Sequence, residues 1–213
     1  MVRRYLLLPP VVRVLLIANV AMFMLEIAGG VQVIYALALW PVQSPGLMML
    51  QAAPPFEIWQ LVSYSFLHGS VLHLLLNMYA LWLFGSRMEN VWGSRPFTFY
   101  YFFCVIGAAL LQLYIASEGA LEGSIYPTVG ASGGVFGLLL GFGLTFPNEK
   151  LMLIFPPVVL SAKWFVLIFG IIELWAGVSG TQAGVAHFAH LGGMLFGFLL
   201  LMYWRRNPPR SFG

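Results

Sequence analysis

The sequence predicts an all-α membrane protein with six transmembrane helices and both termini in the cytoplasm. Of its 213 residues, 61% are apolar and 8% are charged, whereas soluble domains contain roughly 25% charged residues. Apolar runs long enough to cross a bilayer recur along the chain, and the basic residues fall in alternate connections between these runs. A membrane β-barrel would instead show short alternating segments with polar inward faces. None are present in the sequence.

Six apolar runs are expected to span the bilayer, since a helical crossing needs about 20 residues. They cover residues 11–29, 69–86, 97–116, 131–146, 163–179 and 184–204. Two other apolar stretches are not expected to cross. Residues 31–40 are too short and stop at Pro41, while residues 56–67 mix Trp, Tyr, Glu and Gln with apolar positions. Such a mixture is typical of a helix that lies at the interface.

The basic residues predict the orientation of the spans. All ten lie before or at the start of the first span, between the second and third, between the fourth and fifth, or after the sixth: Arg3, Arg4, Arg13, Arg87, Arg95, Lys150, Lys163, Arg205, Arg206 and Arg210. Because basic loops stay in the cytoplasm, both termini are expected there. Their scattered distribution does not indicate binding of nucleic acid.

These boundaries divide the chain into three parts. The expected parts are a cytoplasmic N-terminal segment at 1–10, a six-helix domain at 11–205 and a cytoplasmic tail at 206–213. The outer loop of the domain, residues 30–68, is expected to carry the interfacial helices. The N-terminal MVRRYLLLPP has no small-residue cleavage site, so it is expected to be retained.

Polar residues inside a membrane mark function by default. Counted from the cytoplasmic ends of their helices at about 1.5 Å per residue, Ser132, His190 and His73 all lie roughly 21–23 Å above the inner surface. The fourth span is too short to cross fully, so Ser132 should lie below the outer headgroups. Non-helical backbone at residues 128–131 then implies a water-filled pocket that opens outward.

Glycines predict which helices meet. Gly133, Gly137 and Gly141 recur every fourth residue on the fourth span, and Gly193 and Gly197 do so on the sixth. Such spacing lets helix backbones approach closely. We therefore expect these two faces to bring Ser132 and His190 toward hydrogen-bonding distance.

A serine paired with a histidine base can form an acyl-enzyme if donors stabilise the oxyanion. Ser132 would begin a helix whose free N–H groups point at such a charge, and His73 and Asn77 would add side-chain donors. The chain contains no aspartate, so we expect a Ser–His dyad rather than a Ser–His–Asp triad. His190 should then be held by packing, with Phe136 stacked on its ring.

Three stretches together resemble the signature regions of the rhomboid intramembrane serine proteases. They are HGSVLHLLLNMYALWLFG (68–85), GASGGVFG (130–137) and AHLGGMLFG (189–197). The resemblance implies Ser132 as nucleophile, His190 as general base, and an oxyanion hole of His73, Asn77 and the Ser132 backbone N–H. It also implies supporting roles for Gly130, Gly133, Phe136, Gly193 and Gly197. Phe136 replaces a common tyrosine, and Trp59-Gln60 replaces a common Trp-Arg, which leaves the anchoring of that loop open.

The resemblance further implies a compact bacterial form in the plasma (inner) membrane. This enzyme would cleave transmembrane segments of single-pass or multi-pass protein substrates near the outer face of the bilayer. Water would come from the outer face, and neither a cofactor nor a metal is expected.

Two alternatives stay open. The first is a catalytically inactive rhomboid-like protein that binds clients. The second is a metal or haem protein that uses His68, His73, His187 and His190, although no HExxH motif and no nearby carboxylate ligand supports it. The roles of His187 and Glu173 are also open. We expect His187 to line the cavity or its outer rim, and Glu173 to make an interhelical hydrogen bond.

Overall fold

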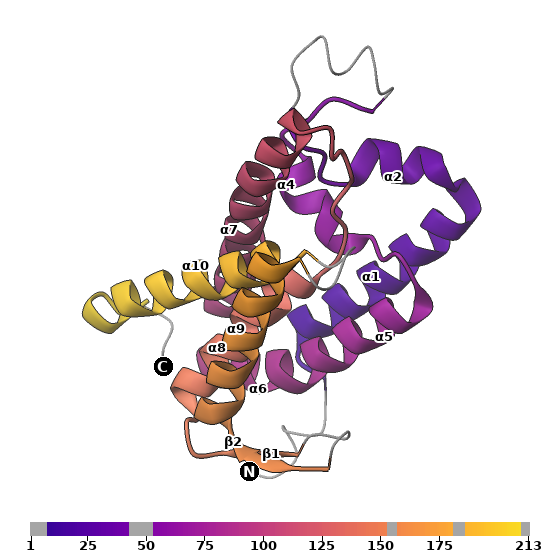
Figure 1. The fold of residues 1–213 in the computed structure, drawn as a ribbon. Helices are drawn as coiled ribbons and strands as arrows, with labels where there is room; N and C mark the ends of the chain where they lie inside the picture. The colour runs from indigo at the N-terminus through magenta and orange to yellow at the C-terminus, as the bar shows by residue number, and fades with distance from the viewer. Residues whose placement is uncertain (1–7, 43–52, 153–156, 181–185, 210–213) are drawn as a thin grey trace.

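The computed structural model describes residues 8–42, 53–152, 157–180 and 186–209, which form a bundle of helices with one short hairpin (Figure 1). The first helix, α1 (Pro10–Gly29), begins with a proline, which suits a first turn that needs no N–H bond. It ends at Gly30, whose φ of 59° turns the chain into the short helix α2 (Val31–Leu37). The first expected span is thus a helix, and residues 31–40 form no second crossing.

A sharp bend separates the loop region from the next long helical segment. The short helices α4 (Gln60–Ser63) and η2 (Tyr64–Phe66) are bent by 101° from the following helix. That helix runs as α5 (Val71–Ala80), a π-helical turn η3 (Leu81–Gly85) and α6 (Ser86–Trp92). It is longer than the expected 69–86, because the chain turns only at Gly93, where φ is 83°.

Gln60 anchors the loop before this bend, which the sequence had left open. Its side chain is 1% exposed. Its Oε1 accepts from the Trp40 N–H at 3.2 Å and its Nε2 donates to Pro55 O at 3.4 Å. The neighbouring Trp59 donates its indole N–H to Ala36 O at 3.0 Å. The Trp-Gln pair therefore ties the start of α4 to the last turn of α2 and to the chain that follows it.

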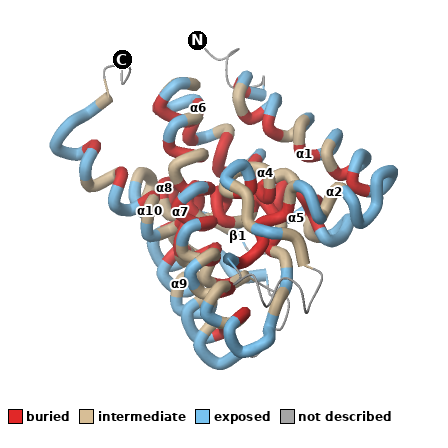
Figure 2. The backbone as a smooth tube through the Cα atoms, turned by 90° about the horizontal axis from the view of Figure 1, so that it is seen from above, coloured by how far each residue is buried: buried red, intermediate tan, exposed pale blue. Residues whose placement is uncertain are grey.

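The remaining helices surround α8 (Ser132–Thr145), nine of whose 14 residues are buried. Against it pack α7 (Ser94–Leu121) and α10 (His187–Arg206), which also contact each other extensively. The hairpin of β1 (Lys150–Met152) and β2 (Val159–Ser161), which the sequence analysis did not predict, leads into α9 (Ala162–Ser179). Figure 2 shows α9 at the edge of the bundle with mostly exposed residues, the face that a bilayer would cover.

The described part of the structure contains four or five of the six expected membrane-spanning helices. Within the described residues, four helices are long and apolar enough to span a membrane: α1, α7, α9 and α10. The bent segment that contains α5 and α6 makes a fifth if it counts as one span. The apolar helix α8 is shorter, about 21 Å against a core of about 30 Å. Six crossings and the side of the termini remain predictions.

Candidate active site

Backbone hydrogen bonds hold the loop that delivers Ser132. Thr128 and Leu39 exchange N–H···O bonds of 2.9 and 3.0 Å, and the Gly130 N–H donates to Tyr64 O at 2.9 Å. Gly130 has a φ of 128°, which a side chain rarely tolerates. Protein groups thus satisfy part of the hydrogen-bonding capacity of this non-helical backbone, as its position below the membrane surface requires.

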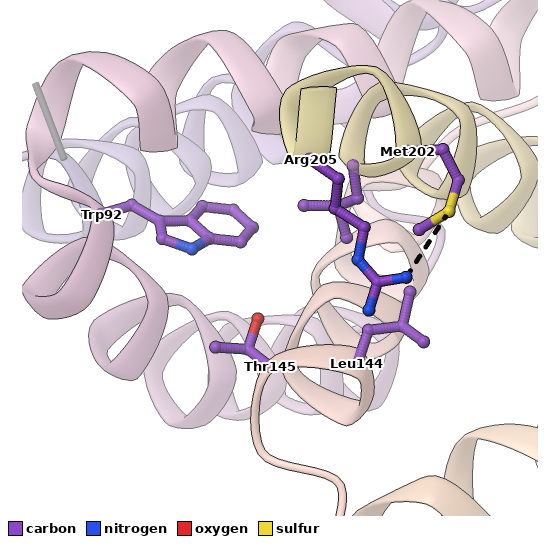
Figure 3. A pocket seen from close by; sticks show the side chains of 6 residues that line it. Trp92, Leu144, Thr145, Met202 and Arg205 are labelled. Atoms are coloured by element: carbon purple, nitrogen blue, oxygen red, sulfur yellow. Dashed lines mark hydrogen bonds between the residues drawn. The ribbon is translucent and has the colours of Figure 1, made fainter. Parts of the chain in front are cut away.

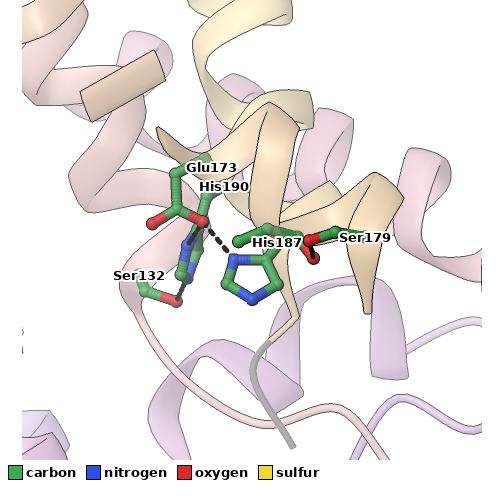
Figure 4. A network of polar contacts seen from close by, with 6 residues as sticks. Ser132, Glu173, Ser179, His187 and His190 are labelled. Carbon is green, nitrogen blue, oxygen red and sulfur yellow. Dashed lines mark hydrogen bonds and ion pairs between the residues drawn. The ribbon is translucent and has the colours of Figure 1, made fainter. Parts of the chain in front are cut away.

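Ser132 is the first residue of α8, but it does not cap the helix. Ala131 occupies the capping position and no side chain bonds to the first turn. The Ser132 Oγ instead lies 2.8 Å from Nε2 of His190, which sits in the first turn of α10 (Figure 4). The structure thus brings together the two residues that the sequence assigned to one depth.

Glycines permit this approach, as expected for Gly133, Gly137 and Gly193. A methyl group on Gly193 would overlap the carbonyl group of Gly133, and one on Gly137 would lie 2.5 Å from Cys104 Sγ on α7 and 3.0 Å from Gly193 O on α10. Gly141 and Gly197 differ from the expectation, because a methyl group on either would meet the hydroxyl of Tyr100 on α7. The glycine faces therefore accommodate α7 as well as each other.

The ring of Phe136 stacks on the imidazole of His190. The ring centroids are 4.2 Å apart and the planes differ by 5°. Phe136 lies one helical turn after Ser132, so a single turn of α8 supplies both the hydroxyl at Nε2 and the surface under the ring.

His73 lies at the same site, across Gly130 from the hydroxyl. A methyl group on Gly130 would be 2.9 Å from His73 Nε2 and 3.5 Å from Ser132 Oγ. Asn77 follows one turn later on α5 and is 5% exposed. Its Nδ2 donates to His73 O at 3.0 Å, which uses one of the two amide hydrogens.

Glu173 is the residue that the sequence analysis underestimated. Its Oε2 lies 2.8 Å from Nδ1 of His190 and 2.6 Å from Nδ1 of His187 (Figure 4). The expected interhelical hydrogen bond is confirmed, since Glu173 is on α9 and both histidines are on α10. The expectation that packing alone holds His190 is wrong.

A signal for this contact was present in the sequence. Gly170 and Gly177 lie three residues before and four after Glu173, which places all three on one helix face. Methyl groups on these glycines would lie 3.3 Å from Met194 and 3.2 Å from His187 on α10. This small-residue face marks the side of α9 that meets α10.

His187 is also placed differently from the expectation. It is 6% exposed and bonded to Glu173, so it is a buried member of the network and not part of an outer rim. That it lines the cavity stays a prediction. Glu173 also supplies the carboxylate that the metal alternative was thought to lack. The ligand atoms of Glu173, His187 and His190 lie within 4.8 Å of one another. Nδ1 of both histidines contacts the Glu173 carboxylate, and the Ser132 hydroxyl lies at Nε2 of His190.

Two cavities among the described residues lie elsewhere. One of about 160 Å³ is lined by Trp92, Leu144, Thr145, Leu201, Met202 and Arg205 (Figure 3). The other, of about 600 Å³, is lined by residues of the last turn of α10 and by Asn207. Thr145 is about 20 Å along α8 from Ser132, and Met202 is about 18 Å along α10 from His190, so neither cavity adjoins the serine. The water-filled pocket beside Ser132 stays a prediction.

Comparison with known proteins agrees with the motifs. The family model of the Rhomboid domain matches residues 55–207. The chain is similar to Rhomboid protein 1, mitochondrial, of Saccharomyces cerevisiae, with 32% identity over 73% of this chain and 44% of the yeast protein. RHOMBOID-like protein 4 of Arabidopsis thaliana is 38% identical over 68% of this chain and 33% of its own length. Presenilin-associated rhomboid-like protein, mitochondrial, of Homo sapiens is 30% identical over 68% of this chain and 39% of its own length.

These comparisons correct one expectation. The chain spans less than half the length of these relatives, and the yeast and human proteins are mitochondrial by name. The expected location in a bacterial plasma membrane is therefore wrong. Motif and hydropathy patterns reveal that a protein is built for a bilayer, but they carry no information about which membrane holds it.

Proposed function

Since this chain belongs to the rhomboid family, we propose that it is a serine endopeptidase that cleaves transmembrane segments of membrane-protein substrates within the bilayer. The single observation that carries the proposal is the 2.8 Å contact between Ser132 Oγ and His190 Nε2 at the start of α8. A hydroxyl in contact with an imidazole is the arrangement that activates a serine nucleophile.

The proposed reaction proceeds through an acyl-enzyme. Ser132 Oγ attacks the peptide carbonyl while His190 Nε2 takes the hydroxyl proton, which it then returns to the departing amine. Water hydrolyses the resulting ester with His190 again as base, which releases the acid product and restores the serine.

Donors around Ser132 would stabilise the oxyanion. The N–H groups of the first turn of α8 have no acceptor within the helix, and the positive end of the helix dipole lies there. His73 lies across Gly130 from the hydroxyl, and Asn77 follows it one turn later on α5. Their side chains would add donors to these backbone groups. Removal of one such donor typically costs about 10²–10³ in kcat.

In the proposed membrane arrangement, α8 is a sixth, short span enclosed by the other helices, and both termini lie on the basic side. Substrates would be single-pass or multi-pass transmembrane proteins that approach from the bilayer, and water would reach Ser132 from the opposite side to the termini. The names of the yeast and human relatives point to a mitochondrial membrane.

The test combines a fluorophosphonate probe with cleavage of a panel of single-pass substrates by the protein in proteoliposomes. We expect labelling and cleavage that disappear in Ser132→Ala and persist in a chelator. Ser65→Ala is a matched control, because Ser65 is buried and its Oγ donates to Val62 O at 2.7 Å, within its own helical segment. Chelator-sensitive cleavage that persists in Ser132→Ala would refute the serine mechanism, and a client-binding protein without protease activity would show no labelling.

A further inference from the structure

The carboxylate of Glu173 is unusual for its position, in the fourth turn of an apolar helix. A charged side chain inside a membrane span is costly, so it faces the protein and pairs with other groups. The Glu173 side chain is 12% exposed and the structure supplies two partners, Nδ1 of His187 and Nδ1 of His190. Apolar residues flank it on either side in FGIIELWAG, so the contact with α10 is its polar environment.

We propose, on the basis of the protease function above, that Glu173 is a positioning residue that completes a Ser132–His190–Glu173 group. An ionised carboxylate only accepts hydrogen bonds, so Nδ1 of His190 must carry the hydrogen at this 2.8 Å contact. In the neutral imidazole the other nitrogen, Nε2, then bears the lone pair. Glu173 therefore fixes the tautomer in which His190 accepts the Ser132 proton.

The same carboxylate stabilises the charge that forms during the reaction. When Nε2 takes the serine proton, the His190 ring becomes an imidazolium between Phe136 and Glu173. A fixed negative charge in contact with this cation lowers its energy in an apolar site and needs no rearrangement. The Phe136 face restricts the tilt of the ring, and the Nδ1 bond restricts its rotation in the plane.

His187 positions Glu173 in turn. It lies three residues before His190 on the same face of α10, and its Nδ1 is 2.6 Å from the oxygen that His190 also uses. Two donors on one carboxylate oxygen hold the Glu173 side chain in a single orientation. The close approach of Gly177 to His187 keeps α9 at the distance that this bridge requires.

The experiment measures kcat and KM on a transmembrane substrate in proteoliposomes for Glu173→Gln and Glu173→Leu, with Ser132→Ala in parallel. Gln keeps an acceptor for Nδ1 but lacks the charge, and Leu lacks both. We expect kcat to fall about 100-fold in Leu, the lower end of what base catalysis contributes, and about 10-fold in Gln, with KM unchanged. Glu118→Gln, which removes the same charge from an exposed position on α7, is the matched control and should retain full activity.

A spectroscopic measurement covers the case in which Glu173→Leu does not fold. The ¹⁵N NMR signals of histidine, assigned with His190→Gln, should show Nδ1 protonated and Nε2 unprotonated in the resting wild-type protein, and a mixture of tautomers in Glu173→Gln. Unchanged kcat in folded Glu173→Gln and Glu173→Leu, or the opposite tautomer in the wild type, would overturn the role of Glu173. Cleavage that persists in Ser132→Ala would instead overturn the protease function itself.

Discussion

The imidazole of His190 lies parallel to the ring of Phe136, with ring centroids 4.2 Å apart and an interplanar angle of 5°. Aromatic pairs of this kind contribute about 0.5–1.5 kcal/mol beyond their buried area. Phe136 and Ser132 are both on α8, and His190 is on α10. The ring contact therefore orients His190 toward Ser132.

Replacing Phe136 should therefore change catalysis more than stability. We expect Phe136→Leu to lower kcat about three- to tenfold, the equivalent of one lost ring contact, and Phe136→Tyr to retain the wild-type rate. Phe142→Leu is the control, since Phe142 is on the same helix but packs against Phe84 at 5.2 Å, away from the site. An unchanged kcat in Phe136→Leu would show that the ring does not orient His190.

Gly193 is the position at which α8 and α10 tolerate no side chain. A methyl group there would overlap the Gly133 carbonyl, which cannot move without shifting the first turn of α8. We expect Gly193→Ala to lower the free energy of unfolding by about 1–3 kcal/mol and to abolish fluorophosphonate labelling of Ser132. Thermal unfolding in detergent and probe labelling measure the two effects.

Gly119→Ala provides the comparison for Gly193→Ala. Gly119 is also helical, but a methyl group there would lie 3.9 Å from the nearest atom outside its own turn, Ser124 O. Alanine favours a helix over glycine by about 0.5–1 kcal/mol, so this variant should be as stable as the wild type or more so. Equal stability of the two variants would contradict the close helix contact.

Asn77 offers a test of the oxyanion donors that separates catalysis from helix structure. We expect Asn77→Ala to lower kcat about 10²–10³-fold while the protein stays folded. Asn19→Ala is matched to it, because Asn19 donates to Leu15 O at 2.7 Å through the same i−4 bond, on a helix that carries no site residue. A similar loss of kcat in both variants would indicate a general structural effect instead.

The sequence could predict most of the helices and the serine–histidine contact, since both follow from periodicities that run along one helix. Basic residues located the ends of the spans, depth counting then aligned Ser132 with His190, and glycine spacing placed their helices together. The contact at Glu173 could not be read in this way. Both sides of α9 are apolar, so the single glutamate does not reveal which side packs against the protein. The spacing of Gly170 and Gly177 around Glu173 is needed to identify that side.

Glu89 is a second residue whose role depends on the tertiary fold. Its carboxylate accepts from the N–H groups of Val11 and Val12 at 3.0 and 2.8 Å, and from the Ser94 hydroxyl at 2.7 Å. It therefore caps α1 from a position nearly 80 residues away along the chain. Local motifs predict caps only from neighbouring residues, and Pro9 before α1 supplies none.

Glu89→Gln should therefore destabilise the protein without a direct effect on the chemistry. The carboxylate is 3% exposed, accepts three hydrogen bonds and lies at the positive end of the α1 dipole. Hydrogen bonds to a charged group contribute about 1.5–3 kcal/mol, so we expect a loss of about 2 kcal/mol in the free energy of unfolding, with kcat of the folded fraction unchanged. Glu149→Gln is the control, because its pair with Arg87 is exposed and 3.6 Å long, and such pairs contribute about 0–1 kcal/mol. If both variants unfold at the wild-type temperature, Glu89 does not stabilise the start of α1.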